Sequence, residues 1–281
     1  MLGKLIKYEW QGMKKPLLIL FLVLLGITLL TAILILTINP SHDDIATGFS
    51  IMFTLLSVFL YYFGIIACSF GTMLLIAIRF YKTCYTDEAY LTHTLPVSTK
   101  QLVAAKTITA VLCQLLSVLL IVVTMVLLIS VFITHMINLG EFQASDFSLD
   151  WSTLNAEFKE EMGVSFTGYF GFMGIYSLIG SVTGTIMILG CISLGQLYAK
   201  HRILGAIIAY FGVTTILQIV AYLGMIPMYG QIFKAELSGE TLNMVTVMGP
   251  TFLIILVASI TLAVILHFVN IHMMSKRLNL E

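Results

Sequence analysis

The residues that most often do chemistry in proteins are few in this chain, and they are scattered along it. Among 281 residues there are six histidines and four cysteines, and His and Cys do not cluster together at metal-ligand spacing. The sequence has no H-E-x-x-H and no G-x-S-x-G, so it offers no candidate site for an intramembrane protease or a lipid hydrolase. We therefore expect no catalytic residue, no metal site and no cofactor.

The sequence also lacks a motif for a second kind of chemistry, nucleotide hydrolysis. The phosphate-binding loop G-x-x-x-x-G-K-[ST] does not occur in the sequence, so any use of ATP must come from another polypeptide. We expect the chain not to be an enzyme. Of the cysteines, Cys68, Cys113 and Cys191 lie in apolar segments and Cys84 lies beside one, so we expect no structural disulfide.

Six long apolar segments account for most of the chain, of which 59% is apolar. A helix needs about 20 residues to cross the hydrocarbon core of a bilayer, and only a helix satisfies its own backbone there. Each segment is about that long or longer. We expect an all-α polytopic membrane protein, a single domain over residues 1–281, with spans near Pro16–Ile38, Met52–Ile78, Leu102–Thr134, Phe170–Leu197, Ile203–Ile226 and Pro250–Ile271.

The basic residues fix the expected orientation. Twelve of the 14 Lys and Arg residues fall on one side of these segments, and basic loops stay in the cytoplasm. The opposite loops carry ten of the 14 acids. Both termini are therefore predicted to be cytoplasmic in a cell-membrane protein. The formal net charge of zero is the sum of a basic face and an acidic face, and it gives no support for nucleic acid binding.

Residues 1–15 are predicted to form an interfacial helix before the first span. Apolar residues including Trp10 share one face of Leu2–Lys15 and lysines share the other, as in a helix that lies among lipid headgroups. Glu9 projects from the apolar face. Either Glu9 reaches water at the edge of that face, or it pairs with a basic group of a cytoplasmic loop or partner subunit.

Two loops are predicted on the acidic side. Residues 135–168 form a long acidic loop in which a short amphipathic helix starts at Asp150 or Ser152 and ends at Gly163. Residues 227–249 form a shorter loop that is either re-entrant or lies on the surface. All five prolines fall at predicted boundaries, so we expect none of them to interrupt a helix.

The spans contain small and weakly polar residues but no deep acid or base, which lowers the weight of an ion-coupled carrier. Polar side chains such as Ser117, Thr124 and Asn270 are predicted to hold helices together rather than to line a substrate path. The small residues are candidates for close helix packing. Of these we single out Gly64, Gly71, Gly180 and Gly184.

The most informative soluble segment is residues 79–101, between the second and third spans. A short helix capped by Thr86 is predicted to stop before Pro96, and Ser98 with Gln101 forms a capping box at the start of the third span. The sequences T-D-E-A-Y-L and T-L-P-V-S, followed by Lys106, together with K-Y-E-W in the first helix, resemble the permease subunits of type-2 ATP-binding-cassette exporters.

The resemblance implies a coupling helix that docks on a separate ATPase subunit. Partners would be ATP-binding-cassette ATPase subunits, a second permease subunit and membrane lipid, and the substrate would be amphipathic or hydrophobic. Within the segment, Tyr90 and Leu91 are expected as apolar anchors and two acids as rim contacts, while His93 is either solvent-facing or a contact. The ATPase-coupling candidates are Asp87, Glu88, Tyr90, Leu91, His93 and Leu95.

A function from a different class stays open. The chain could be a membrane-embedded immunity, scaffold or sensor protein that binds partners without transporting anything. Copurification separates the two hypotheses, because a permease should bring down an ATPase with a phosphate-binding loop and a scaffold need not.

Overall fold

The computed structural model describes residues 2–38, 45–86, 88–89, 97–140, 151–198, 200–238 and 244–276. Over these residues the chain is helical apart from short turns and caps. The bounded helices are α1 (Leu2–Leu36), α2 (Ile45–Tyr85), α4 (Thr99–Asn138), α5 (Trp151–Met162), α6 (Phe166–Gly195), α7 (Arg202–Ser238) and α8 (Met244–Lys276).

Six of these helices, all except α5, are long and apolar enough to cross a membrane by length and composition. The prediction of six spans in an all-α protein is confirmed at this level, and the chain is a multi-pass helical membrane protein. Several helices extend past the predicted spans. At 1.5 Å per residue, the 41 residues of α2 measure about 60 Å, roughly twice the hydrocarbon thickness.

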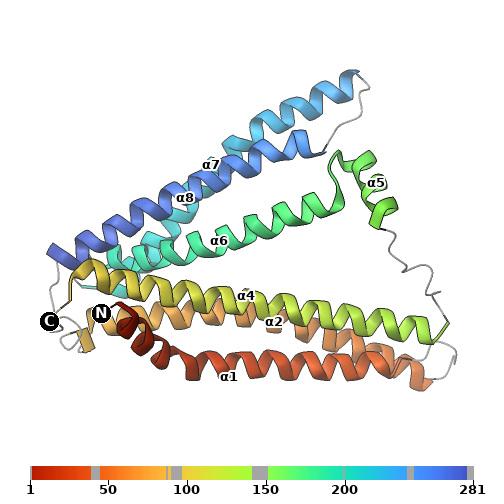
Figure 1. Ribbon diagram of the computed structural model, residues 1–281, viewed down its shortest axis with the longest axis horizontal. Coiled ribbons are helices and arrows are strands. Elements are labelled where there is room, and N and C mark those ends of the chain that lie inside the picture. Colours follow the sequence, from red (N-terminus) through yellow and green to blue (C-terminus); the bar gives the residue numbers. More distant parts are fainter. Residues whose placement is uncertain are drawn as a thin grey trace. The chain divides into compact units, whose positions relative to one another are not determined.

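The prediction that no proline interrupts a helix is wrong. Pro16 lies inside α1, Pro227 inside α7 and Pro250 inside α8. A proline inside a helix has no N–H to give to the carbonyl four residues earlier, and such helices bend at that point. Figure 1 shows the N-terminal turns of α1 bent away from the axis of the rest of that helix. The interfacial segment and the first span are therefore one bent helix.

The faces of that N-terminal segment agree with the sequence pattern. Met13 is buried, and Leu5, Ile6 and Trp10 are half-buried. The lysines of the segment are exposed. Amphipathic periodicity therefore predicted correctly which side chains pack inward, although it placed the end of the helix at the proline.

The described residues divide into two compact units. The N-terminal unit comprises Gly3–Arg79 and Leu112–Leu149, and the C-terminal unit comprises Met1–Leu2, Phe80–Val111 and Asp150–Glu281. In the N-terminal unit, α1, α2 and most of α4 lie side by side (Figure 1). Its core contains Leu24 and Ile35 of α1, Tyr61 and Cys68 of α2, and Leu128 of α4.

The C-terminal unit is built around α6, which packs against both α7 and α8. Its core joins Met187 and Cys191 of α6, Val213 of α7, and Ala263 and Leu266 of α8. This unit also contains the end of α2 and the first turns of α4, so the segment between those helices is attached to it at both ends.

Glycines mark the closest helix contacts, but only some of the predicted ones do so. A Cβ at Gly64 would lie 3.3 Å from Ile27, and one at Gly71 would lie 2.5 Å from Leu20, so both glycines admit α1 against α2. Beside Gly180 and Gly184 no described atom lies within 4 Å of a Cβ position. The close approach of α6 to α8 occurs farther along α6, at Gly190, where an added Cβ would lie 2.6 Å from Leu266 of α8.

The acidic loop contains the helix that its spacing predicted. α5 begins at Trp151, and the chain turns at Gly163, whose φ of 79° is in the left-handed region that favours glycine. Ser165 then caps α6 by accepting a hydrogen bond from the Gly168 N–H at 3.2 Å. The segment 227–249 differs from the predicted loop, because α7 continues to Ser238 and α8 begins at Met244.

Candidate functional site

The candidate site is the pair of helix ends between which the predicted coupling segment lies, the end of α2 and the start of α4. Thr86 donates its hydroxyl to the Lys82 carbonyl of α2 at 2.6 Å, and its own carbonyl accepts from the Ala89 N–H at 2.8 Å. Glu88 is exposed and helical. The other coupling candidates lie outside the described residues: Asp87, Tyr90, Leu91, His93 and Leu95.

On the far side of the segment, Ser98 caps the start of α4, which is one of the two bonds of the predicted capping box. Ser98 accepts a hydrogen bond from the Gln101 N–H at 3.4 Å through its hydroxyl, and its carbonyl accepts from the Leu102 N–H at 3.1 Å. These bonds satisfy N–H groups that have no partner within the helix. The start of the third span is therefore determined by residues next to it in the sequence.

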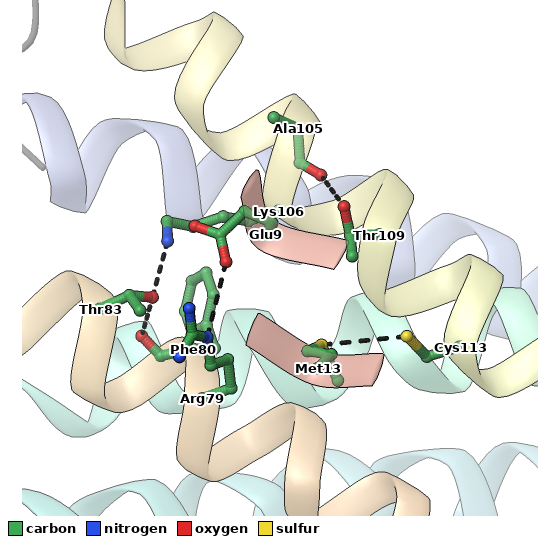
Figure 2. A network of polar contacts seen from close by, with 9 residues as sticks. All are labelled: Glu9, Met13, Arg79, Phe80, Thr83, Ala105, Lys106, Thr109 and Cys113. Carbon is green, nitrogen blue, oxygen red and sulfur yellow. Dashed lines mark hydrogen bonds and ion pairs between the residues drawn. The ribbon is translucent and has the colours of Figure 1, made fainter. Parts of the chain in front are cut away.

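A buried lysine ties the two helix ends together. Lys106 of α4 is 4% exposed, and its ammonium donates to the Thr83 hydroxyl of α2 at 2.6 Å. The Thr83 hydroxyl in turn donates to the Phe80 carbonyl at 3.4 Å. Figure 2 shows the lysine side chain reaching from α4 to this turn of α2. Because burying a cation costs free energy unless it is hydrogen-bonded, this contact fixes the spacing of the two ends.

A chain of hydroxyl and amide groups connects the end of α2 to the ends of α6 and α8. The Tyr85 hydroxyl donates to the Ser193 hydroxyl at 2.8 Å, and the Ser193 hydroxyl donates to the Asn270 side-chain carbonyl at 2.7 Å. All three side chains are buried. Hydrogen bonds in series strengthen one another, and each would be costly to leave unmade in an apolar interior. The last turn of α2 is thereby held to two further helices.

An ion pair holds the N-terminal helix in the other unit. Glu9 of α1 lies 3.8 Å from Arg79 of α2, measured from the carboxylate oxygen to Nε, and the two side chains are 16% and 35% exposed. Figure 2 shows the two groups facing each other. A side chain at Gly12 would overlap the Arg79 guanidinium, so the glycine makes room for it. Of the two alternatives for Glu9, this geometry agrees with the one in which the carboxylate pairs with a basic group.

Sequence reasoning missed the roles of two residues of this site, whereas Asn270 was predicted to hold helices together. Ser193 was not singled out, and Lys106 was treated as one of the cytoplasmic charges. The signal was present, because Lys106 stands on the same helix face as Val103 and Ala110, which are buried. A lysine on an apolar face needs a partner.

Polar groups farther along the spans link helices or close on their own backbone. In the N-terminal unit the Tyr61 and Thr124 hydroxyls lie 3.0 Å apart, and Cys68 lies 3.7 Å from Ser117. In α7, Thr214 and Thr215 donate to carbonyls of their own helix. The predicted role in holding helices together therefore agrees with the contacts of Ser117, Thr124 and Asn270.

The arrangement connects helix ends mechanically. Over the described ranges, no three His, Cys, Asp or Glu side chains lie together in a way that could hold a metal ion. The four cysteines, Cys68, Cys84, Cys113 and Cys191, are free and buried. The described residues hold the end of α2 and the start of α4 to each other, and they hold the end of α2 to α6 and α8.

Comparison with known proteins adds no relative. No protein-family model, no curated protein and no solved structure matches this chain.

Proposed function

We propose that this chain is the membrane-spanning permease subunit of an ATP-driven exporter for an amphipathic or hydrophobic substrate. It would act in the cell membrane with a second permease chain and separate ATPase subunits, and its termini would be cytoplasmic. The observation that carries the proposal is the anchoring of both ends of the segment between α2 and α4, through Tyr85 on one end and Lys106 on the other.

The anchoring supports a coupling role for physical reasons. A force applied to a free loop is absorbed by changes in loop conformation, whereas a force applied to a fixed helix end moves the helix. Tyr85 is bonded through Ser193 to Asn270, so a displacement of the end of α2 is passed to α6 and α8. The bond from Lys106 to Thr83 couples α4 to the same displacement.

In the proposed cycle, closure of the ATPase subunits presses on the segment that contains Tyr90 and Leu91. The displaced ends of α2 and α4 then shift the helices to which they are bonded, and access to the substrate path passes from one membrane face to the other. Residues of this chain bind and move, and they make or break no covalent bond. ATP is hydrolysed in the partner subunit.

Copurification of an ATPase with this chain from its native cells, followed by transport in proteoliposomes, tests the proposal. Tyr90→Ala combined with Leu91→Ala should strongly lower recovery of the ATPase, because apolar anchors at an interface centre dominate its binding energy. Asp87→Asn combined with Glu88→Gln should weaken recovery moderately and in a salt-dependent way, as rim charges do.

The control variant removes an equal charge from a different helix. Glu157 and Glu160 of α5 are exposed, so Glu157→Gln combined with Glu160→Gln removes the same charge from another helix and should leave ATPase recovery unchanged. Full recovery and normal transport in both segment variants would refute the coupling role. Absence of any ATPase from the wild-type preparation would favour the immunity, scaffold or sensor alternative.

A further inference from the structure

An apolar pocket in the C-terminal unit has no part in the anchoring described above. It lies among the end of α5, the first turns of α6 and the first turns of α8, and its volume is about 280 Å³. The lining includes Met162, Tyr169, Phe172, Met248, Gly249 and Phe252, and no Asp, Glu, Lys or Arg is among the lining residues. Such a lining of methionines and aromatic rings is typical of sites that accept apolar ligands.

The walls of the pocket are held in place by contacts of their own. The Phe252 ring of α8 lies 5.4 Å from Tyr176 and 6.3 Å from Phe172 of α6, both in edge-to-face geometry. α5 is held over α6 by Phe158, whose ring lies 5.6 Å from Tyr169. The Asn155 side chain also accepts a hydrogen bond from the Thr167 N–H at 3.3 Å. The pocket is therefore formed by packed helices.

Water is a poor occupant of this pocket. At about 30 Å³ per molecule the volume has room for roughly nine waters, and each needs two to four polar partners. The residues that line the pocket offer almost none. An empty space of this size would also forfeit the dispersion contacts of its walls. An apolar occupant satisfies both conditions.

We propose that the pocket binds an acyl chain of a membrane phospholipid. α6 and α8 are membrane-spanning by length and composition, and the candidate spans include residues 166–195 and 247–275. The pocket thus opens among segments whose solvent is hydrocarbon. The neighbouring helix α5 carries the exposed acids Glu157 and Glu160 against Lys159, which disfavours an anionic headgroup and favours a zwitterionic one with its ammonium. The binding does not depend on the transport function proposed above.

Gly249 is the position at which a substitution tests the proposal. It lines the pocket, and a Cβ added there meets no described atom within 4 Å. Gly249→Leu therefore places a side chain in the space that the acyl chain would occupy, and because the residue before Pro250 is restricted in a helix, its thermal unfolding is compared with that of the wild type. Gly230 of α7 is outside the pocket and likewise has no atom within 4 Å of a Cβ position, so Gly230→Leu is the matched control.

The experiment is photolabelling of the purified full-length protein in nanodiscs that contain phosphatidylethanolamine with a diazirine in one acyl chain. Labelled peptides are quantified by mass spectrometry, with labels on the exposed face of α7 as the internal reference for surrounding lipid. We expect enriched labelling at Phe172, Met173 and Phe252. In Gly249→Leu this labelling should fall about tenfold. A tenfold loss of binding corresponds to about 1.4 kcal/mol in total, close to the free energy of burying two methylene groups.

The labelling should be unchanged in Gly230→Leu. Equal labelling of the pocket and of the α7 reference in the wild type would overturn the proposal, because the lipid would then be surrounding lipid only. Enriched labelling that persists in Gly249→Leu would overturn it as well. Both results are independent of ATPase copurification, so they do not bear on the transport function.

Discussion

Removal of one hydroxyl group, that of Ser193, tests whether the end of α2 is held by its polar contacts. Ser193→Ala deletes the group that accepts from Tyr85 at 2.8 Å and donates to Asn270 at 2.7 Å. Interhelical hydrogen bonds in membrane proteins contribute on average about 0.6 kcal/mol and at most about 1.7 kcal/mol each. Two bonds are lost and two buried groups are left without this partner, so we expect a loss of about 2 kcal/mol.

The same chain predicts how two substitutions combine. Tyr85→Phe keeps the ring and removes only the donor, so it should cost about 1 kcal/mol, since Ser193 can still donate to Asn270. In the double variant Tyr85→Phe with Ser193→Ala, the bond between these residues is removed only once. The double cost should therefore fall short of the sum of the single costs by about 1 kcal/mol.

Reversible unfolding of the purified protein in mixed micelles, with increasing dodecyl sulfate, measures these free energies. Ser130→Ala is the control, because Ser130 is exposed and its hydroxyl donates to the Leu127 carbonyl of its own helix at 2.8 Å. It should change stability by less than about 0.5 kcal/mol. If Ser193→Ala behaves like Ser130→Ala, or if the two costs add fully, the polar chain does not hold α2 and the coupling argument loses its basis.

Three further predictions concern other parts of the molecule. Gly195→Ala should lower thermal stability by about 1–3 kcal/mol, because the new Cβ would overlap α7 at its first turns, whereas Gly212→Ala, with no described atom within 4 Å, should gain up to about 1 kcal/mol. Glu9→Gln should leave the protein inserted, change its stability by less than about 1 kcal/mol and lower substrate-stimulated ATPase activity of the complex; wild-type activity would reduce the ion pair with Arg79 to a surface contact. Single cysteines at Asp146 and at Lys200, in a background without native cysteines, should label from outside and only after permeabilisation, respectively; labelling at position 200 in intact cells would contradict the cytoplasmic assignment of the termini.

Local signals in the sequence predicted local structure well. The apolar length of the spans, the amphipathic spacing of α5 and the capping residue Ser98 each depend on neighbours within a few positions, and each agrees with the helices described here. The bounds were less accurate. Pro16, Pro227 and Pro250 suggested ends because proline opposes helix in water, but a membrane span has no solvent for a free backbone and continues through a bend.

Contacts between distant positions were beyond the sequence for a physical reason. Tyr85 and Ser193 are 108 positions apart, and Ser193 and Asn270 are 77 apart. Nothing in the spacing of either pair indicates that the residues meet. The glycines show the same limit, because Gly64 and Gly190 pack against a neighbouring helix while Gly180 faces no described atom. Small residues permit close packing, and the partner helix decides where it occurs.

The burial of all four native thiols makes the protein report on its own unfolding. Cys68, Cys84, Cys113 and Cys191 are each at most 2% exposed, so a bulky maleimide cannot reach them while the helices stay packed. Cys68 and Cys113 belong to the N-terminal unit and the other two to the C-terminal unit. The order in which the four thiols react with the maleimide under mild destabilisation would therefore show when each unit opens. The measurement uses the native protein and needs no added cysteine.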